Sequence, residues 1–419
     1  MKPSFFNIVC AAAWLFWSGQ PVHAITLTVL LLSNASTEKP LQRLLDQYSR
    51  EHPGVNFNVS IVQYGAALTA KINTLLAGGQ PPDVLEVTTA YIQTYADQAL
   101  DLAGYTNGDD LLNRYLPSYQ AFIKSGRKVI GIPLEATVNG LFYNEDLFRQ
   151  AGISVPSDPE HVWTWAQFKD ALEKVMKLPT CRIGVAYDCS VQRWSNLLYQ
   201  SGGRWISPDG NAFLPDLPAA EQALTFFRSL VAARLVPTSS WPGKTDGGQL
   251  FKTGVAAMMW TGNWELKTLV EGGTRFPFGT TYFPRNVIRS ACPGGEFFIG
   301  FARSPYHDEA AKLMLWWAQP SITQRYLESL GGSLLSPMKD VPVNYGKYAA
   351  YLKPMIDDLA ATPPWVAEDL AKPELNLLQN DLLDQLILYS TGRTPLGTAI
   401  NNMKNLAAQL LAEDRAHGK

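Results

Sequence analysis

The chain has 419 residues, of which 46% are hydrophobic and only 17% are charged. An average domain has roughly 25% charged residues, so the composition excludes a disordered, highly charged chain. Lys and Arg number 35 and Asp and Glu number 37, giving a formal net charge of −2, which excludes the basic excess that a nucleic-acid groove or an anionic membrane surface requires.

The N-terminus predicts a secretory signal peptide over residues 1–24. Lys2 precedes an apolar run over residues 5–17, and Val22-His23-Ala24 places small or apolar residues at the −3 and −1 positions of a cleavage site after Ala24. The run is shorter than the roughly 20 residues that span a bilayer. We therefore expect a mature protein that is soluble in the periplasm.

Strands and helices alternate over residues 25–100. Leu41, Leu44, Leu45 and Tyr48 have the i, i+3, i+4, i+7 spacing of an amphipathic helix, and residues 55–61 alternate between apolar and polar as a strand does. The predicted elements are strand 25–32, helix 37–51, strand 55–61, a helix with Leu68, Ile72, Leu75 and Leu76 on one face, strand 83–87 and a helix-like stretch at 91–100. This order predicts an α/β lobe with an open, mostly parallel sheet, helices on both faces, and ligands beyond the carboxyl ends of its strands.

The remaining residues predict a second α/β lobe, because the mature chain exceeds the roughly 250–300 residues at which a single core stops growing. The predicted elements are a connection at 132–135 into a strand reaching 143, strand 182–188, helix 191–200, helix 219–233, strand 255–260, strand 297–301, helix 308–318, and a mostly helical segment at 373–417 broken at 391–395. No low-complexity linker separates them, which suggests that strands cross directly between the lobes.

Three cysteines remain in the mature chain: Cys181, Cys189 and Cys292. A strand at 182–188 would hold Cys181 and Cys189 about 26 Å apart, beyond the roughly 7 Å that a disulfide allows between Cα atoms. Pairing of Cys292 with either one stays open. The histidines are scattered and no CxxC or HExxH motif occurs, so we expect no metal and no cofactor.

Four sets of motifs follow one another along the chain. They are LLAGGQPPDV at 75–84; IPLE at 132–135 with LFYNEDLF at 141–148 and WTW at 163–165; FKTGVAAM at 251–258 with GNW at 262–264; and GG at 294–295 with SP at 304–305, AAK at 310–312 and QP at 319–320. In this order they resemble the maltose-type extracellular solute-binding proteins of bacterial ABC importers, known as solute-binding protein family 1. The resemblance extends over essentially the whole mature length.

The resemblance implies a two-lobed periplasmic-binding-protein fold of class α/β, with a mostly parallel sheet flanked by helices in each lobe and a multi-crossing hinge that closes on a ligand. Carried onto this chain, lobe one is 25–134 plus 285–332 and lobe two is 135–284 plus 333–419. The implied protein is a monomer without enzymatic activity. Its implied partners are a small sugar or polyol and inner-membrane ABC permease subunits with a cytoplasmic ATPase.

Sugars present apolar ring faces and polar edges, which aromatic rings and polar side chains bind respectively. Trp264 occupies the family position that stacks on sugar rings, and core packing is the alternative for it. Thr261 and Asn263 share its turn, and Trp194 opens a helix at a family-like site position. All ten Trp of the mature chain lie after residue 160, so we expect the second lobe to supply ring platforms.

The first lobe is expected to supply contacts to the sugar edge. The candidates follow strand ends or the first crossing between lobes: Asn34, Ser36, Gln63, Tyr64, Glu86, Thr88, Thr89, Tyr91, Glu135, Gly295 and Glu296. Val87 and Ala90 stand where the maltose binder has Trp and Asp, which favours a ligand other than maltose. Glu135 is as compatible with a solvated hinge carboxylate as with a ligand contact.

Two other functions fit parts of the pattern. A secreted glycoside hydrolase would need two carboxyls roughly 5–9.5 Å apart across a sugar subsite, and no motif pairs Glu86, Glu135 or Glu296. A binding protein for a phosphorylated small molecule such as glycerol phosphate would need Arg or Lys at the site. Arg193 and Arg204 flank Trp194 in the sequence, with no orientation implied.

Overall fold

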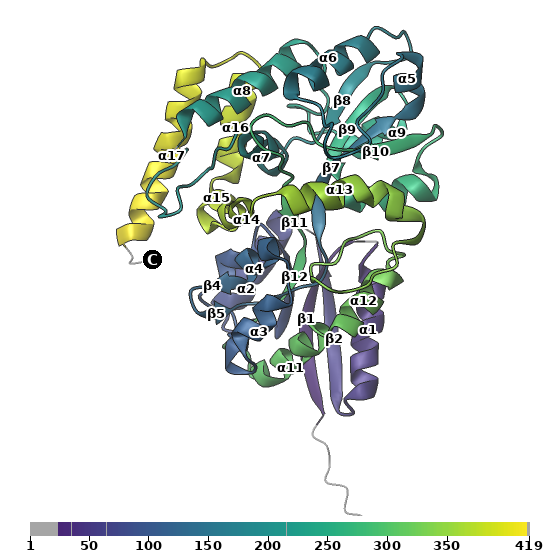
Figure 1. The fold of residues 1–419 in the computed structure, drawn as a ribbon. Helices are drawn as coiled ribbons and strands as arrows, with labels where there is room; N and C mark the ends of the chain where they lie inside the picture. Colours follow the sequence, from purple (N-terminus) through teal and green to yellow (C-terminus); the bar gives the residue numbers. More distant parts are fainter. Residues whose placement is uncertain (1–23, 35, 64, 215, 417–419) are drawn as a thin grey trace, which may run out of the picture.

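The computed structural model describes residues 24–34, 36–63, 65–214 and 216–416, which form two lobes stacked one above the other in Figure 1. The predicted signal peptide, apart from Ala24, lies outside the described residues. The chain enters the lower lobe at its N-terminal strand, and its C-terminal helix packs along one side of the upper lobe. We call the lower one the first lobe and the upper one the second lobe.

The first lobe is built on a five-stranded sheet in the order β2-β1-β3-β12-β6. Its strands are β1 (Ile25–Leu32), β2 (Val55–Val62), β3 (Val84–Thr88), β6 (Ile132–Pro133) and β12 (Glu296–Gly300). β1 pairs in parallel with β2 and β3, whereas β12 is antiparallel to both β3 and β6. The sheet is mixed because β12 enters it from the second lobe, in the opposite direction to β3.

The second lobe is built on a sheet in the order β10-β7-β9-β8, with β11 also paired to β7. Its strands are β7 (Thr137–Asn144), β8 (Ile183–Tyr187), β9 (Ala256–Gly262), β10 (Phe278–Thr281) and β11 (Pro293–Gly294). Only β8 and β9 are parallel, and β7 is antiparallel to β9, β10 and β11. The prediction of a mostly parallel sheet is therefore wrong for this lobe, although the α/β class and the two-lobed fold are confirmed.

Most predicted helices are confirmed, with ends that shift by a few residues. Helices beside the first sheet are α1 (Glu38–Glu51), α2 (Ala66–Ala77), α3 (Gly108–Asn113), α4 (Pro117–Ile123), α11 (His307–Trp317) and α12 (Pro320–Ser329). Those of the second lobe are α5 (Glu145–Gln150), α6 (Trp165–Val175), α7 (Val191–Gln200), α8 (Leu217–Ala232), α9 (Gly247–Lys252), α10 (Leu266–Thr268), α13 (Ala349–Ala361), α14 (Pro364–Leu370), α15 (Pro373–Leu377), α16 (Gln379–Ser390) and α17 (Leu396–Ala416). The predicted break at 391–395 separates α16 from α17.

The stretch at 91–100 does not form the predicted helix. Only a short 3₁₀ helix, η1 (Ile92–Tyr95), forms there. Ala99 then makes a bridge with Phe301, and the Leu100 N–H donates to the Gly300 carbonyl at 2.8 Å. Pairing with a segment 200 residues away in the chain thus replaces the helical hydrogen bonds.

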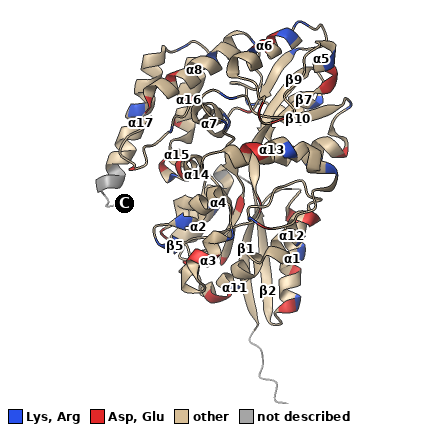
Figure 2. Ribbon diagram, viewed as in Figure 1, with Lys and Arg blue, Asp and Glu red and all other residues tan. Residues whose placement is uncertain are grey.

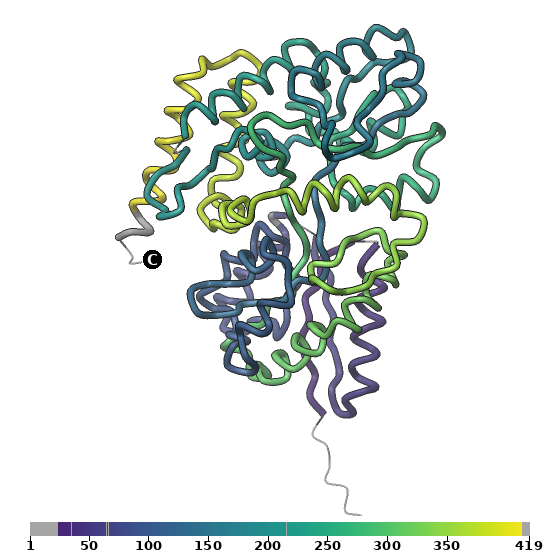
Figure 3. Tube along the Cα trace, viewed as in Figure 1, coloured from purple at the N-terminus to yellow at the C-terminus, as the bar shows by residue number. Residues whose placement is uncertain are grey.

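Within the described residues the chain passes between the lobes in three places, visible along the tube in Figure 3. β6 leads through Glu135 into β7, and β11 leads through Gly295 into β12. The third passage follows α12 and ends at α13, which packs against β7 and β10. The lobes are therefore connected by short crossing segments and not by a flexible linker.

The lobe boundaries drawn from the sequence stay a prediction, and one set of contacts bears on them. Residues 285–294 were assigned to lobe one, yet the Arg285 N–H donates to the Trp163 carbonyl at 2.8 Å. The Cys292 N–H likewise donates to the Asn196 side chain at 2.8 Å. These contacts favour placing 285–294 with the second lobe.

The aromatic residues mostly fill the cores. Seven of the ten Trp after residue 160 are buried, and Trp163, Trp264 and Trp365 are half-buried. Trp163, Trp264 and Trp365 are therefore the tryptophans of this set that keep appreciable exposed surface. Cys181, Cys189 and Cys292 are free thiols, two of them buried.

Charged residues of both signs are interspersed along surface helices such as α1 and α13 (Figure 2). Among the described residues, no helix has the length and apolarity required to cross a bilayer.

Candidate functional site

The edge of the first sheet that faces the second lobe collects five strand ends. β1, β2, β3 and β6 reach it with their carboxyl ends, and the antiparallel β12 begins there. The carboxyl end of an α/β sheet is where ligands of such folds bind. We call this edge the rim; the predicted residues Asn34, Glu86, Thr88, Glu135 and Glu296 lie on it.

Three glutamates form a buried cluster at the rim, which we call the carboxyl cluster: Glu86, Glu135 and Glu296. Glu86 is fully buried, and its Oε2 accepts the Leu32 N–H at 2.7 Å. Glu135 is 1% exposed; its Oε1 accepts the Glu296 N–H at 2.7 Å, and its Oε2 accepts the Tyr326 hydroxyl at 3.4 Å. The alternative of a solvated hinge carboxylate therefore does not fit Glu135.

The cluster favours protonated carboxyl groups. Burial, and then the neighbouring Glu296, raise the pKa of both Glu86 and Glu135 well above the usual range. Burial also raises the pKa of Glu296, while hydrogen bonds from Glu86 and Asn34 act in the opposite direction. Because Glu86 and Glu296 are hydrogen-bonded through their carboxyl groups, one of them must carry the proton between them.

The other candidates on β3 and β12 surround this cluster. The Thr88 hydroxyl is buried without a hydrogen-bond partner in the described residues. Thr88 lies directly opposite Glu296 in the β3–β12 pair. The Thr89 hydroxyl donates to the carbonyl of the buried Gly295 at 3.3 Å, and Tyr91 is half-buried nearby on the same loop.

The candidates after β1 and β2 lie further along the rim. The Asn34 side chain accepts the Ser36 N–H at 3.0 Å, which orders the loop after β1. Gln63 is exposed, and its side-chain amide donates to Ser33 Oγ at 3.0 Å. Tyr64 lies outside the described residues.

In the second lobe, Trp264 follows β9, and its indole ring contacts Gly262 and Arg193. Its ring packs against Gly262, where an added Cβ would lie 1.9 Å from Cζ3 of the indole. The guanidinium carbon of Arg193 lies 4.4 Å from the indole centroid, a cation–π contact. A ligand can therefore stack on this ring only where Arg193 leaves a ring face open.

Arg193 and Asp188 are the residues of this region that the sequence did not assign to the site. Arg193 Nε lies 3.4 Å from Asp188 Oδ2, and the Arg193 side chain is 13% exposed. Asp188 Oδ2 also accepts the Thr261 hydroxyl at 2.9 Å, and its Oδ1 accepts the Gly247 N–H at 2.8 Å. The pairing of β8 with β9 brings these residues together, and no local sequence signal predicts it.

Three second-lobe candidates are buried and already bonded or packed. Asn263 accepts the Val138 N–H at 3.0 Å and donates to the Ala136 carbonyl at 3.4 Å. Thr261 is 1% exposed, and Trp194 is 1% exposed with its ring packed near Trp205. Their burial favours structural roles behind the site surface.

The two lobes approach each other at Gly294. A Cβ added there would lie 2.8 Å from Thr137 Oγ1, 3.4 Å from Gln192 Nε2 and 3.6 Å from Thr89 Oγ1. Gln192 lies in the first turn of α7 in the second lobe, and Thr89 follows β3 in the first lobe. Side chains of both lobes therefore converge on the second crossing segment.

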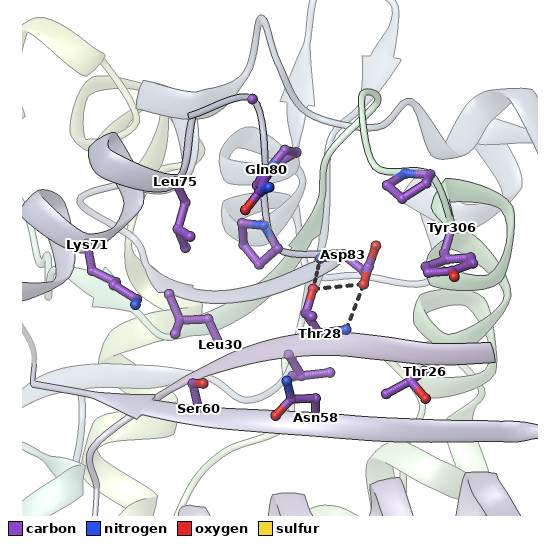
Figure 4. Close-up of a pocket in the computed structure, with 15 residues that line it drawn as sticks. Thr26, Thr28, Leu30, Asn58, Ser60, Lys71, Leu75, Gln80, Asp83 and Tyr306 are labelled. Carbon is purple, nitrogen blue, oxygen red and sulfur yellow. Dashed lines mark hydrogen bonds between the residues drawn. The ribbon is translucent and has the colours of Figure 1, made fainter. Parts of the chain in front are cut away.

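A separate pocket of about 380 Å³ lies away from the rim, between α2 and the strands β1 and β2 (Figure 4). At its floor, Asp83 accepts hydrogen bonds from the N–H and hydroxyl of Thr28, at 2.6 and 2.8 Å. None of the predicted site residues in the described part of the chain lines it. In the part of the chain that the structure describes, no group of three or more His, Cys, Asp or Glu side chains is arranged to bind a metal ion.

A sequence model of one protein family matches most of this chain. The model of the bacterial extracellular solute-binding proteins covers residues 34–324.

This chain belongs to the bacterial extracellular solute-binding protein family.

Relatives and solved structures agree with this assignment. The lactose-binding protein of Rhizobium radiobacter is 27% identical over 314 residues, which cover 71% of this chain and 72% of that protein. The GacH receptor of Streptomyces glaucescens, solved unliganded and with acarbose, has a TM-score of 0.75 at 22% identity and covers 92% of this chain and 98% of its own. A solute-binding protein of Agrobacterium vitis with bound D-mannitol has a TM-score of 0.73 at 18% identity, covering 93% and 98%. The predicted family, fold and solute-binding function of this protein are thus confirmed.

Proposed function

We propose that this solute-binding protein captures a neutral or cationic sugar or polyol between its lobes and delivers it to an ABC permease in the inner membrane. The observation that supports the proposal is the rim, where carboxyl, amide and hydroxyl groups of the first lobe converge. Gln192 of the second lobe reaches the same crossing segment at Gly294, and its chain neighbour Arg193 stacks on Trp264. Polar groups of this kind bind sugar hydroxyls, and an indole covers the apolar face of a sugar ring. The names of the relatives, which include lactose and mannitol binders, support the same ligand class.

The structure argues against hydrolysis at this site. A glycosidase holds its two carboxyls on either side of the scissile bond, at least about 5 Å apart. Glu86 and Glu296 are in hydrogen-bond contact, and the Glu296 backbone bonds to Glu135. A sugar does not fit between the Glu86 and Glu296 carboxyls at this distance, which supports ligand binding over glycoside hydrolysis as the function of this site.

The charges argue against a phosphorylated ligand. An anion would need unpaired cations at the site. Arg193 is paired with Asp188 and stacked on Trp264, and Arg204 stacks on Trp365.

A thermal-shift screen of the mature protein against sugars, polyols and their phosphates tests this function. A ligand that binds only the folded state raises stability by RT ln(1+[L]/Kd), about 2.7 kcal/mol at 100 times Kd. We expect a dose-dependent rise in Tm with at least one neutral or amino sugar or polyol and none with the phosphates. A Tm that no sugar or polyol changes would refute the proposal.

Delivery to an inner-membrane permease also requires export. We propose cleavage after Ala24 and residence in the periplasm. Mass spectrometry of the protein recovered from a periplasmic fraction should give a mature N-terminus at Ile25.

A further inference from the structure

The guanidinium of Arg193 lies against Trp264, the ring that the proposed function assigns to the ligand. From this contact we propose that Arg193 is a positioning residue, which holds the Trp264 indole in the orientation that stacks on a sugar or polyol, and that Asp188 in turn holds Arg193. The inference rests on the proposed sugar-binding function and names the residues that set the orientation of its aromatic ring.

The Trp264 ring has few contacts that could fix its orientation without Arg193. It is half-buried, and a half-buried ring lacks the close packing that confines a core side chain to one rotamer. On the chain side it lies against the backbone of Gly262, where an added Cβ would be 1.9 Å from Cζ3 and 2.1 Å from Cη2. The Arg193 guanidinium carbon, 4.4 Å from the ring centroid, supplies the charged contact that fixes the ring.

Arg193 is itself held on two sides. Its Nε lies 3.4 Å from Asp188 Oδ2, and its Nη1 donates to the side-chain oxygen of Gln192. The Arg193 side chain is largely buried, so its interactions with the carboxylate and with the ring are less screened by water than on an open surface. The guanidinium therefore stays beside the indole when a ligand arrives, and the ligand stacks on the ring surface that Arg193 leaves open.

Asp188 joins this arrangement to the framework of the second sheet. It directly follows β8, and its Oδ2 accepts the hydroxyl of Thr261 on β9 at 2.9 Å. Its Oδ1 accepts the N–H of Gly247, the first residue of α9, at 2.8 Å. Two strands and a helix thus hold the carboxylate that holds Arg193, so the ring is oriented before the ligand binds, which reduces the entropy lost on binding.

The first experiment measures the ring without a ligand. A tryptophan contributes to the near-UV circular dichroism spectrum when its surroundings are fixed, so wild type minus Trp264→Phe isolates the signal of this indole. The same difference taken in the Arg193→Ala background should be much smaller. A difference spectrum of unchanged size and shape would overturn the inference.

The second experiment is a double-mutant cycle, measured by calorimetry with the tightest binder among lactose, D-glucose, D-mannitol and D-sorbitol. Arg193→Ala should weaken binding about tenfold. In the Trp264→Ala background the same change should add less than about twofold, because no ring remains to be held. A further loss of about tenfold there would show that Arg193 contacts the ligand directly, and a tighter Kd for Arg193→Ala would show that it blocks the ring; either result overturns the inference.

Three more variants separate the charge from the fold. Asp188→Asn keeps the size of the side chain but not the charge that holds Arg193, and it should weaken binding in wild type and have little effect in the Arg193→Ala background. Arg193→Lys keeps a cation for the ring and should bind more tightly than Arg193→Ala; an equal loss would contradict the role of the charge. Arg228→Ala removes a comparable contact, 5.0 Å from the Tyr389 ring, elsewhere in the second lobe, and should leave both dichroism and Kd unchanged.

The outcomes distinguish this inference from the proposed function. Unchanged dichroism, or an unchanged Kd in Arg193→Ala, overturns the role of Arg193 and leaves sugar binding standing. If neither these four compounds nor the wider thermal-shift screen yields a sugar or polyol that binds, both fail.

Discussion

Replacement of Glu135 tests whether the carboxyl cluster holds the crossing segments together. Glu135 lies on the first crossing and accepts the backbone N–H of Glu296, which follows the second crossing. Its other oxygen accepts the hydroxyl of Tyr326 on α12. Glu135→Ala removes both acceptors, whereas Glu135→Gln retains an amide oxygen for the Glu296 N–H.

The expected magnitude follows from these two bonds. A buried donor left without an acceptor costs about 1–3 kcal/mol. The Glu296 bond at 2.7 Å is short and the Tyr326 bond at 3.4 Å is long, so we expect Glu135→Ala to lower the free energy of unfolding by about 2–4 kcal/mol at pH 5. At the same pH we expect Glu135→Gln to lie within about 1 kcal/mol of wild type, as for an exchange that keeps its hydrogen bonds.

The two variants should respond differently to pH. Burial and Glu296 raise the pKa of Glu135 in the folded state, so the folded protein binds more protons than the unfolded chain at pH values above about 4.5. The free energy of unfolding then falls as the pH rises towards the folded-state pKa. Glu135→Gln has no proton to lose at this position, so its unfolding free energy should fall less between pH 5 and 8.

Urea unfolding at pH 5 and pH 8, followed by tryptophan fluorescence and far-UV circular dichroism, measures both effects. If Glu135→Ala is as stable as wild type at pH 5, Glu135 does not hold the crossings. If Glu135→Gln loses as much stability as Glu135→Ala, or shows the full pH slope of wild type, the assignment of the pH effect to this carboxyl is refuted.

Three further predictions concern Trp264, Asp369 and Asp358. Trp264→Ala should weaken the ligand identified by thermal shift at least tenfold, about 1.4 kcal/mol, and an unchanged Kd in calorimetry would remove this ring from the site. Asp369 is 1% exposed and accepts two backbone N–H groups and the Tyr199 hydroxyl, so Asp369→Ala should cost about 3–6 kcal/mol in urea unfolding; a loss below about 1 kcal/mol would contradict this. Burial raises the pKa of Asp358 to about 6, so its stabilising contribution, full below the unfolded-state value, should decline by about 2 kcal/mol as the pH rises from 4 to 7; an equal decline in Asp358→Asn would assign it to other groups.

The parts of the fold with local patterns were predictable from the sequence. The spacing of Leu41, Leu44, Leu45 and Tyr48 predicted α1, and all four residues are buried. The strand directions of the second sheet were not predictable, because β7 pairs with β9, β10 and β11, which lie more than 100 residues further along the chain. The helix predicted at 91–100 was wrong for the same reason, because residues 99–100 pair with the distant end of β12.

In the candidate site, too, single residues were predictable from the sequence, whereas the long-range contacts between them were not. The sequence named Glu86, Glu135 and Glu296 separately, but no motif paired them, because their contact depends on β12 inserting between β3 and β6. The stacking of Arg193 on Trp264 likewise joins residues 71 positions apart in the sequence. Ring platforms were expected throughout the second lobe, whereas packing against other aromatic rings buries most of its tryptophans.

The position of β12 also sets the order in which the protein can be assembled. β6 ends at Pro133, but its partner in the first sheet is β12, which is complete only at Gly300. A ribosome must therefore synthesise the second sheet's strands before the first sheet can close, and such distant pairing slows folding. Truncation between β6 and β12 should therefore yield aggregation-prone fragments whose first sheet keeps an unpaired edge at β3.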